Sequence, residues 1–294
     1  MAARFLAGVA AGLVWALPAG YARRLAPDRL RGKAVAVVMA GIPVALALGV
    51  PGGALLGGWA GRRAVFSAVT VVAVVLIGWI APTVPGLPGG PRGGRIPIRR
   101  TLAVPGVVPV LFVTLAFVLA PTVLHTCLAA FLGRRGMAGS IDLVLPAFGA
   151  ASLLSVWAVG AHIDRRPRGL VLASAALFAS AAAILATGSG GPGAVYTAAV
   201  LWGLGLGGAP TLVQSAVADA GGPAEDTVRA VLVTLWNAAM AGGAVAGAPL
   251  LRLLGPVSFP WSVLALLLPV LAVVFGARVH GFPVRRRPAA GSAP

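Results

Sequence analysis

The side chains best placed for chemistry in this chain are ionisable groups inside long apolar segments. Arg4 and His125 both lie in such segments, and a charge within a bilayer is costly enough to mark a functional site by default. Histidine changes charge near neutral pH, which makes His125 a candidate for moving protons. Two structural alternatives stay open: Arg4 can reach the membrane surface, and His125 can be a buried side chain hydrogen-bonded to a neighbour.

The chain lacks the residue spacings on which common enzyme classes depend. It contains no HExxH, no GxSxG and no GxxxxGK[ST] sequence. His162 and His280 have no partner at a ligand spacing, so we expect neither a metal site nor a cofactor. The sequence therefore favours a protein that is not an enzyme.

The amino-acid composition indicates a membrane protein. Hydrophobic residues make up 59% of the 294 and charged residues 10%, against about 25% charged residues in a soluble domain. The net charge of +17 comes from basic residues in short loops between apolar segments, which argues against nucleic acid as a partner. The lipid bilayer is the expected surrounding of this chain.

Nine apolar segments reach the length of about 20 residues that crosses a bilayer. The expected spans are 3–22, 34–58, 65–82, 105–132, 141–161, 169–187, 194–217, 228–254 and 258–279. Residues 83–104 are rich in Pro, Gly and Arg, as linkers are. We therefore expect three spans in residues 1–82, a linker at 83–104, six spans in residues 105–280 and a tail at 281–294.

Basic residues are divided unevenly between the two sides of these spans. Seventeen of the 23 Lys and Arg residues fall in loops on one side, which includes the linker and the tail, and six fall on the other. Loops rich in Lys and Arg stay in the cytoplasm. The linker and the C-terminus are therefore predicted to be cytoplasmic, in a multi-pass protein of the plasma membrane.

One local pattern occurs twice, 198 residues apart. Gly49-Val50-Pro51, followed by Leu55-Leu56-Gly57, recurs as Gly-Ala-Pro at 247–249 and Leu-Leu-Gly at 253–255. The two copies lie six spans apart, and parallel repeats of this kind build several transporter folds. The second six-helix unit is complete, whereas the first holds only its last three helices. The sequence therefore predicts a twelve-helix parent whose first three helices are missing.

Four motifs, together with the repeat and the basic linker, resemble the major facilitator superfamily, and within it the arabinose-efflux-like drug:proton antiporters. They are R-x-x-x-G at 4–8, a glycine and proline pattern at 41–57, G-x-x-x-D-R-x-x-R at 160–168, and Trp202-Gly203 with Ala209-Pro210, Gln214 and Asn237. The resemblance implies an all-α membrane protein, a helical bundle of about nine transmembrane helices. It also implies a role in proton coupling for Arg4.

The glycine and proline motif is a candidate gate. Gly49 and Gly53 remove side chains where another helix can approach closely, and Pro51 deletes a backbone hydrogen bond and bends its helix. A bend at a helix seam can seal one conformation. Ordinary glycine packing is the alternative that stays open.

The acidic and basic loop is a second candidate gate. Asp164 can cap the start of a helix, and Arg165 and Arg168 can pair across the loop. The resemblance implies that this loop locks one conformation and opens when the halves of the protein rock. Basic loop charge alone would explain the arginines but not Asp164.

Candidate pocket residues are tryptophans and amides within the spans. They are Trp15, Trp202, Gln214, Trp236 and Asn237. Apolar walls with a few polar groups suit amphiphilic substrates. The alternative for the tryptophans is a place at the membrane interface.

The resemblance implies proton-coupled efflux of small amphiphilic molecules or sugars, with a small-molecule substrate and protons as partners. The absence of three helices from one half leaves a second possibility. The chain can instead be a non-transporting membrane fragment or interaction protein derived from such a transporter.

The predicted orientation can be tested by cysteine labelling after Cys127 is replaced. A cysteine introduced at Gly61 or Gly136 should react with an impermeant maleimide added outside the cell. A cysteine at Gly93 should stay unmodified, because the charge distribution places the linker in the cytoplasm. The reverse labelling pattern would contradict the orientation.

Overall fold

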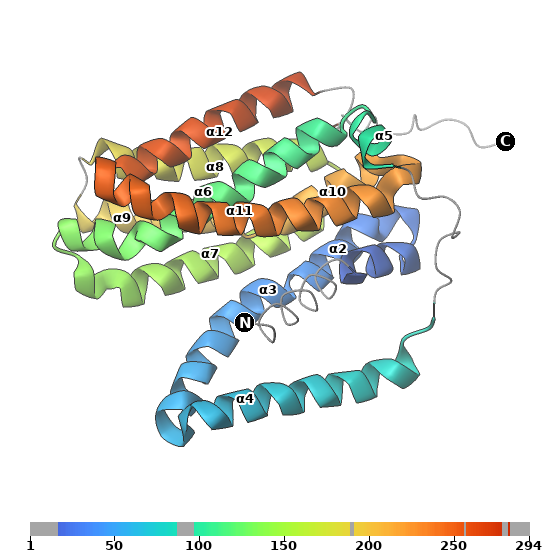
Figure 1. The fold of residues 1–294 in the computed structure, drawn as a ribbon, viewed down its shortest axis with the longest axis horizontal. Helices are drawn as coiled ribbons and strands as arrows, with labels where there is room; N and C mark the ends of the chain where they lie inside the picture. The colour runs from blue at the N-terminus through green and yellow to red at the C-terminus, as the bar shows by residue number, and fades with distance from the viewer. Residues whose placement is uncertain (1–16, 87–96, 189–190, 256, 278–281, 283–294) are drawn as a thin grey trace. The chain divides into compact units, whose positions relative to one another are not determined.

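The computed structural model describes residues 17–86, 97–188, 191–255, 257–277 and 282, and throughout this part the regular elements are helices (Figure 1). Contacts between Cα atoms divide the chain into two compact units. The larger contains Met1–Ala40 and Ile96–Pro294, and the smaller contains Gly41–Arg95. Each unit is described by itself.

The larger unit begins with helical residues 17–25. Its further elements are η1 (Asp28–Leu30), α2 (Arg31–Met39), α5 (Ile98–Leu102), α6 (Val107–Arg134), η3 (Ala138–Ser140), α7 (Ile141–His162), α8 (Pro167–Thr187), α9 (Pro192–Leu206), α10 (Ala209–Gly221), η4 (Gly222–Ala224), α11 (Glu225–Leu254) and α12 (Ser258–Gly276). The long helices follow the long apolar segments, because a helix satisfies its own backbone groups in hydrocarbon.

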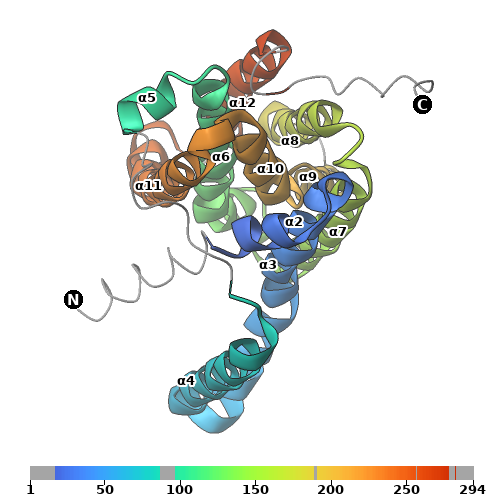
Figure 2. The same ribbon diagram turned by 90° about the vertical axis from the view of Figure 1, so that its right-hand side faces the viewer.

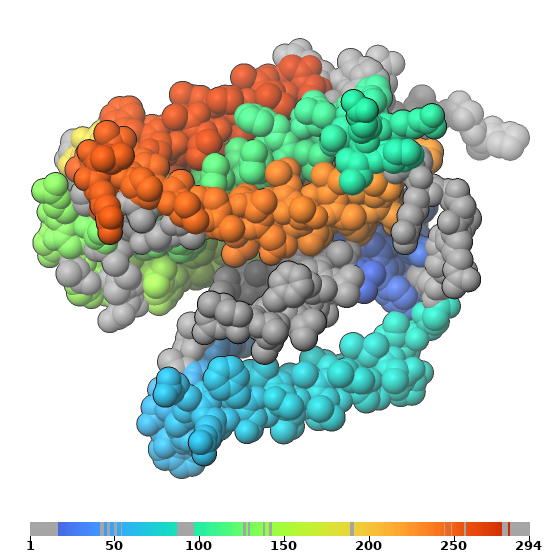
Figure 3. All heavy atoms as spheres, viewed as in Figure 1, coloured from blue at the N-terminus to red at the C-terminus, as the bar shows by residue number. Residues whose placement is uncertain are grey.

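Helices α6 to α12 form a bundle around one apolar core (Figure 2). Helix α9 packs between α7 and α8, and α6 packs against both α11 and α12. Figure 3 shows α6 lying between α11 and α12 on one face of the bundle. Phe131, Phe178, Trp202, Leu232 and Leu267 contribute large buried side chains from five of these helices. The core therefore joins the whole C-terminal part of the chain.

The smaller unit contains α3 (Gly41–Val44), the π-helical turn η2 (Ala45–Gly49) and α4 (Val50–Thr83). Helix α4 is broken at Gly61, where φ is +81° and ψ is 168°. A Cβ added at Gly57 would lie 3.4 Å from Cγ2 of Val65, so the two arms of α4 contact each other beside the break. The break falls between the expected spans 34–58 and 65–82.

Six helical segments of the described residues are long and apolar enough to cross a membrane. They are Leu55–Thr83, Val107–His125, Leu143–His162, Pro167–Thr187, Pro192–Leu254 and Ser258–Gly276. The 63-residue segment covers α9, α10 and α11, and thus two of the expected spans. Most of the expected span 3–22 lies outside the described residues. Span 34–58 is not one regular helix, because α2 ends at Met39 and a π-helical turn follows. The predicted all-α membrane fold is confirmed.

Gly61 is expected to be required at the break of α4, because its backbone angles are open essentially to glycine alone. Gly61→Ala should destabilise the protein by about 1–3 kcal/mol in equilibrium unfolding from mixed micelles. Gly58→Ala is the matched control, since a Cβ at Gly58 meets nothing within 4 Å and its φ is not positive. Equal stability of the two variants would contradict the strain at Gly61.

Candidate functional site

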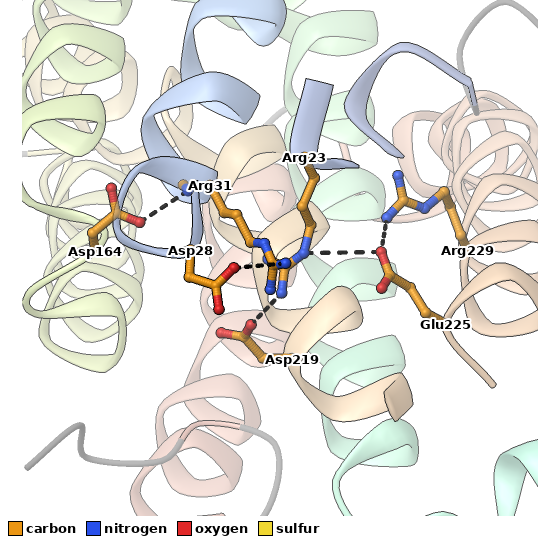
Figure 4. A network of polar contacts seen from close by, with 8 residues as sticks. Arg23, Asp28, Arg31, Asp164, Asp219, Glu225 and Arg229 are labelled. Carbon is orange, nitrogen blue, oxygen red and sulfur yellow. Dashed lines mark hydrogen bonds and ion pairs between the residues drawn. The ribbon is translucent and has the colours of Figure 1, made fainter. Parts of the chain in front are cut away.

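Seven charged side chains gather where residues 17–40 meet the helical bundle, and we call this group the charged cluster (Figure 4). Its members are Arg23, Asp28, Arg31, Asp164, Asp219, Glu225 and Arg229. Four of the six acidic residues of the chain are among them. A chain with so few acids thus places most of them at one end of the larger unit.

Four members form a continuous chain of ion pairs. The guanidinium of Arg23 donates to Oδ1 of Asp219 at 2.7 Å and lies 3.9 Å from Oε1 of Glu225. The same Glu225 oxygen accepts a short hydrogen bond from Arg229 one helical turn along α11. Arg23 belongs to helical residues 17–25, whereas its partners belong to α10 and α11. The pairs therefore join the first described helix to the C-terminal bundle.

Arg229 is the most deeply placed cation of the cluster. Its side chain is buried, and Nε and Nη1 have no hydrogen-bond partner among the described residues. A Cβ added at Gly20 would lie 2.9 Å from Cζ of Arg229, so the guanidinium packs directly on the backbone of the first described helix. Gly20 is needed here to give the guanidinium room.

Asp164 caps the start of α2. Its Oδ1 accepts the backbone N–H of Gly32 at 2.9 Å, and its Oδ2 accepts that of Lys33 at 3.2 Å. The first N–H groups of a helix have no partner within the helix, and a carboxylate there also meets the positive end of the helix dipole. Asp164 thus caps a helix that is distant from it in sequence, and its role in a gate stays a prediction. Arg165 is exposed, and Arg168 donates to the carbonyl of Phe275 at 3.2 Å.

Small residues let α2 approach this loop closely. A Cβ at Gly32 would lie 2.5 Å from Oδ1 of Asp164 and 2.6 Å from Cγ2 of Ile163. A Cβ at Gly160 would lie 3.1 Å from Cβ of Ala36. The glycine that opens the 160–168 motif therefore serves the contact between α7 and α2.

A second group of side chains is aromatic and gathers around Trp202, which is buried, whereas His125 is exposed and Phe148 is half-buried. The ring centroid of Trp202 on α9 is 4.4 Å from that of His125 and 4.8 Å from that of Phe148. Nδ1 of His125 lies 3.1 Å from the carbonyl oxygen of Pro121, so the Nδ1–H tautomer donates within α6. Trp202 is almost fully buried, with Nε1 unpartnered among the described residues, so it packs in the core and not at the membrane interface.

The predicted amides have different surroundings. Gln214 on α10 is buried, and neither of its amide atoms has a partner in the described part of the chain. Asn237 on α11 is exposed and donates from Nδ2 to the carbonyl of Val233 at 2.8 Å. Trp236 is half-buried beside the core. An unpaired buried amide costs about 1–3 kcal/mol, which makes Gln214 the best of these residues for a polar ligand.

The remaining predicted residues lie elsewhere. Arg4 and Trp15 fall outside the described residues. Gly49 ends the π-helical turn of the smaller unit, with Pro51 and Gly53 in the first turn of α4. A Cβ at Gly53 would meet Val65 of its own hairpin at 3.9 Å, which is ordinary contact. Their role as a gate stays a prediction.

Comparison with known proteins identifies the family. The model of the Major Facilitator Superfamily matches residues 1–228. The chain belongs to this superfamily. The prediction of a transporter family and not an enzyme class is thereby confirmed, whereas the narrower resemblance to arabinose-efflux-like antiporters stays a prediction.

Several efflux pumps are similar to this superfamily member. The purine ribonucleoside efflux pumps NepI of Shigella dysenteriae and Escherichia coli K12 are each 31% identical over 201 residues, which is 67% of this chain and 50% of theirs. NepI of Salmonella paratyphi C is 28% identical over 286 residues, covering 94% of this chain and 70% of its own. The chain thus spans about half the length of the first two relatives.

Sequence reasoning missed the core of the charged cluster. The sequence patterns place Arg23 and Arg229 among the basic loop residues and assign no role to Asp219 or Glu225. The rarity of acids was an available signal, because positive loop charge does not explain them. Asp219 and Glu225 lie 196 and 202 residues after Arg23, their common partner, and no local motif encodes a pairing over such a distance.

The cap of α2 can be tested by removing the Asp164 carboxylate. Asp164→Ala should destabilise the protein by about 1–2 kcal/mol, because two helix N–H groups lose their acceptor. Asp164→Asn should cost less, since one acceptor oxygen remains. Asp28→Ala is the control: its pair with Arg31 is exposed, and its loss should cost less than about 1 kcal/mol in the same unfolding titration. A loss from Asp164→Ala no larger than this control would count against the cap.

Proposed function

We propose that this member of the superfamily is a proton-coupled efflux transporter of small amphiphilic molecules or sugars. Purine ribonucleosides are the first substrates to test, since the similar pumps are named for them. A ribonucleoside combines a flat ring system with a sugar and so belongs to both predicted substrate classes. The family match supports transport, and the names of the relatives support efflux.

The charged cluster is the gate of this transporter, and its geometry is the observation that carries the proposal. It holds residues 17–40 to the bundle by ion pairs and by the Asp164 cap, all at one end of the larger unit. These ion pairs join side chains from separate helices, so relative motion of the helices would form or break them. Breaking them frees this end to open, and Gly49, Pro51 and Gly53 are proposed to bend the helix in which they lie.

The cluster lies on the cytoplasmic side of the plasma membrane in this proposal. The excess of Lys and Arg in the loops on this side, 17 against six, supports the assignment. The linker at 83–104 and the tail at 281–294 then also face the cytoplasm. In this proposal the charged cluster closes the cytoplasmic side when its ion pairs are formed.

The proposed substrate and proton residues are different from those of the gate. Trp202 beside His125 offers an aromatic wall for a ring system, and Gln214 offers both a donor and an acceptor. Trp15, Trp236 and Asn237 complete the proposed pocket. Arg4 and His125 are the proposed coupling residues, because each carries an ionisable group inside a span.

The proposal predicts uptake of a radiolabelled purine ribonucleoside into everted membrane vesicles that contain this chain. Uptake should follow an inward-acid proton gradient and stop when an uncoupler removes the gradient. Vesicles without the protein are the control. Membrane-inserted protein that gives no gradient-dependent uptake of adenosine, guanosine or a dye would refute transport by this chain and favour the non-transporting fragment.

The gate predicts a specific pattern in the same assay. Arg23→Asp and Asp219→Arg should each lower uptake at least fivefold, because each replaces the attraction between Arg23 and Asp219 by repulsion between two like charges. The double exchange should restore at least half of the uptake, since it recreates the pair in reverse. If the double exchange gave no more uptake than either single variant, the Arg23–Asp219 pair would not act as a gate for transport.

A further inference from the structure

Helices α9 and α10 follow one another within the apolar segment Pro192–Leu254, and a side chain from α7 lies in the break between them. The hydroxyl of Ser155 donates to the carbonyl of Leu204 at 2.6 Å and accepts the backbone N–H of Gly208 at 3.1 Å. In an unbroken α-helix the N–H of Gly208 would donate to that same carbonyl four residues earlier. The Ser155 hydroxyl therefore occupies the place of one helical hydrogen bond.

The break is confined to about one turn. The bond from Gly207 to the carbonyl of Gly203 is intact at 2.9 Å, and that from Leu212 to the carbonyl of Gly208 is intact at 3.1 Å. Pro210 has no N–H, so the helical ladder also lacks the donor that would face the carbonyl of Leu206. One inserted hydroxyl and one proline thus open the ladder between two regular helices.

Two glycines allow the break to lie directly against α7. A Cβ at Gly207 would lie 2.6 Å from Cα of Ser152, and one at Gly208 would lie 2.9 Å from Cβ of Val159. Both positions have negative φ, so glycine is needed here for close approach and not for its backbone freedom. This contact brings the Ser155 hydroxyl within reach of the open turn.

We propose that Ser155 is a positioning residue that keeps the α9–α10 segment bent and makes the break a hinge. Unpaired backbone groups are costly in hydrocarbon, so the open turn persists only while a polar group satisfies it. The hydroxyl supplies one acceptor and one donor, and it leaves α9 with Trp202 and α10 with Asp219 on separately orientable helices. The role of this hinge in alternating access rests on the proposed transport function, whereas the bend itself does not.

Ser152 provides a matched control on the same helix. Ser152 and Ser155 are both 4% exposed. The Ser152 hydroxyl donates to the carbonyl of Phe148 at 2.9 Å, within α7 itself. Ser152→Ala therefore removes the same atom from an equally buried site without touching the ladder between α9 and α10.

The test measures a distance across the hinge by pulsed electron paramagnetic resonance on the full 294-residue chain in proteoliposomes. After Cys127 is replaced, spin labels are attached at Thr197 on α9 and Ala220 on α10, of which Thr197 is exposed and Ala220 half-buried. A straight helix would separate these positions by about 35 Å. Ser155→Ala lets the N–H of Gly208 pair with the carbonyl of Leu204, so the distance should lengthen toward that value. Ser152→Ala and Ser155→Thr should keep the original distance.

The outcomes separate the hinge from the transport function. An unchanged distance in Ser155→Ala would overturn the proposal and leave the bend to the glycines and Pro210. Should Ser155→Thr fail to fold, the comparison of Ser155→Ala with Ser152→Ala decides alone. Where vesicle uptake is measurable, Ser155→Ala should lower it at least fivefold and Ser152→Ala should not. A longer distance with unchanged uptake would overturn the role in transport, whereas absent uptake in the unmodified chain would refute only the proposed function.

Discussion

Inside a bilayer every backbone N–H and C=O group needs a partner within the protein, and the fold follows from this constraint. The apolar segments form helices because a helix pairs its own backbone. At two places where a helix starts or breaks, another element supplies the partner. The Asp164 carboxylate accepts the first N–H groups of α2, and the Ser155 hydroxyl fills the open turn at Gly208.

The same constraint explains where the charges lie. A charged group is tolerated in or near the hydrocarbon only when it is paired, and the larger unit concentrates its acids at one end. Asp219 and Glu225 pair with Arg23, and Glu225 also pairs with buried Arg229. The pairs of Arg23 join residues that belong to separate helices, which suits the gate proposed above.

Close approach of the helix backbones brings the polar side chains of one helix within reach of the next helix. Gly32 faces Asp164, Gly160 faces Ala36 of α2, and Gly207 lies on the backbone of Ser152. Helices in a membrane gain little from burying apolar surface against each other, so small residues that permit dense packing take over this role. The glycine-rich composition is thus part of the mechanism that positions the polar groups.

The sequence by itself determined the all-helical membrane fold and the family. These depend on long apolar segments and on short motifs, which are local properties. It did not determine which helix Asp164 caps, the ion pairs of Arg23, or the burial of Trp202. Those depend on side chains that are distant along the chain and meet only when helices pack, as Arg23 does with Asp219 across 196 residues. Tertiary packing alone decided them, because no local pattern specifies which helices become neighbours.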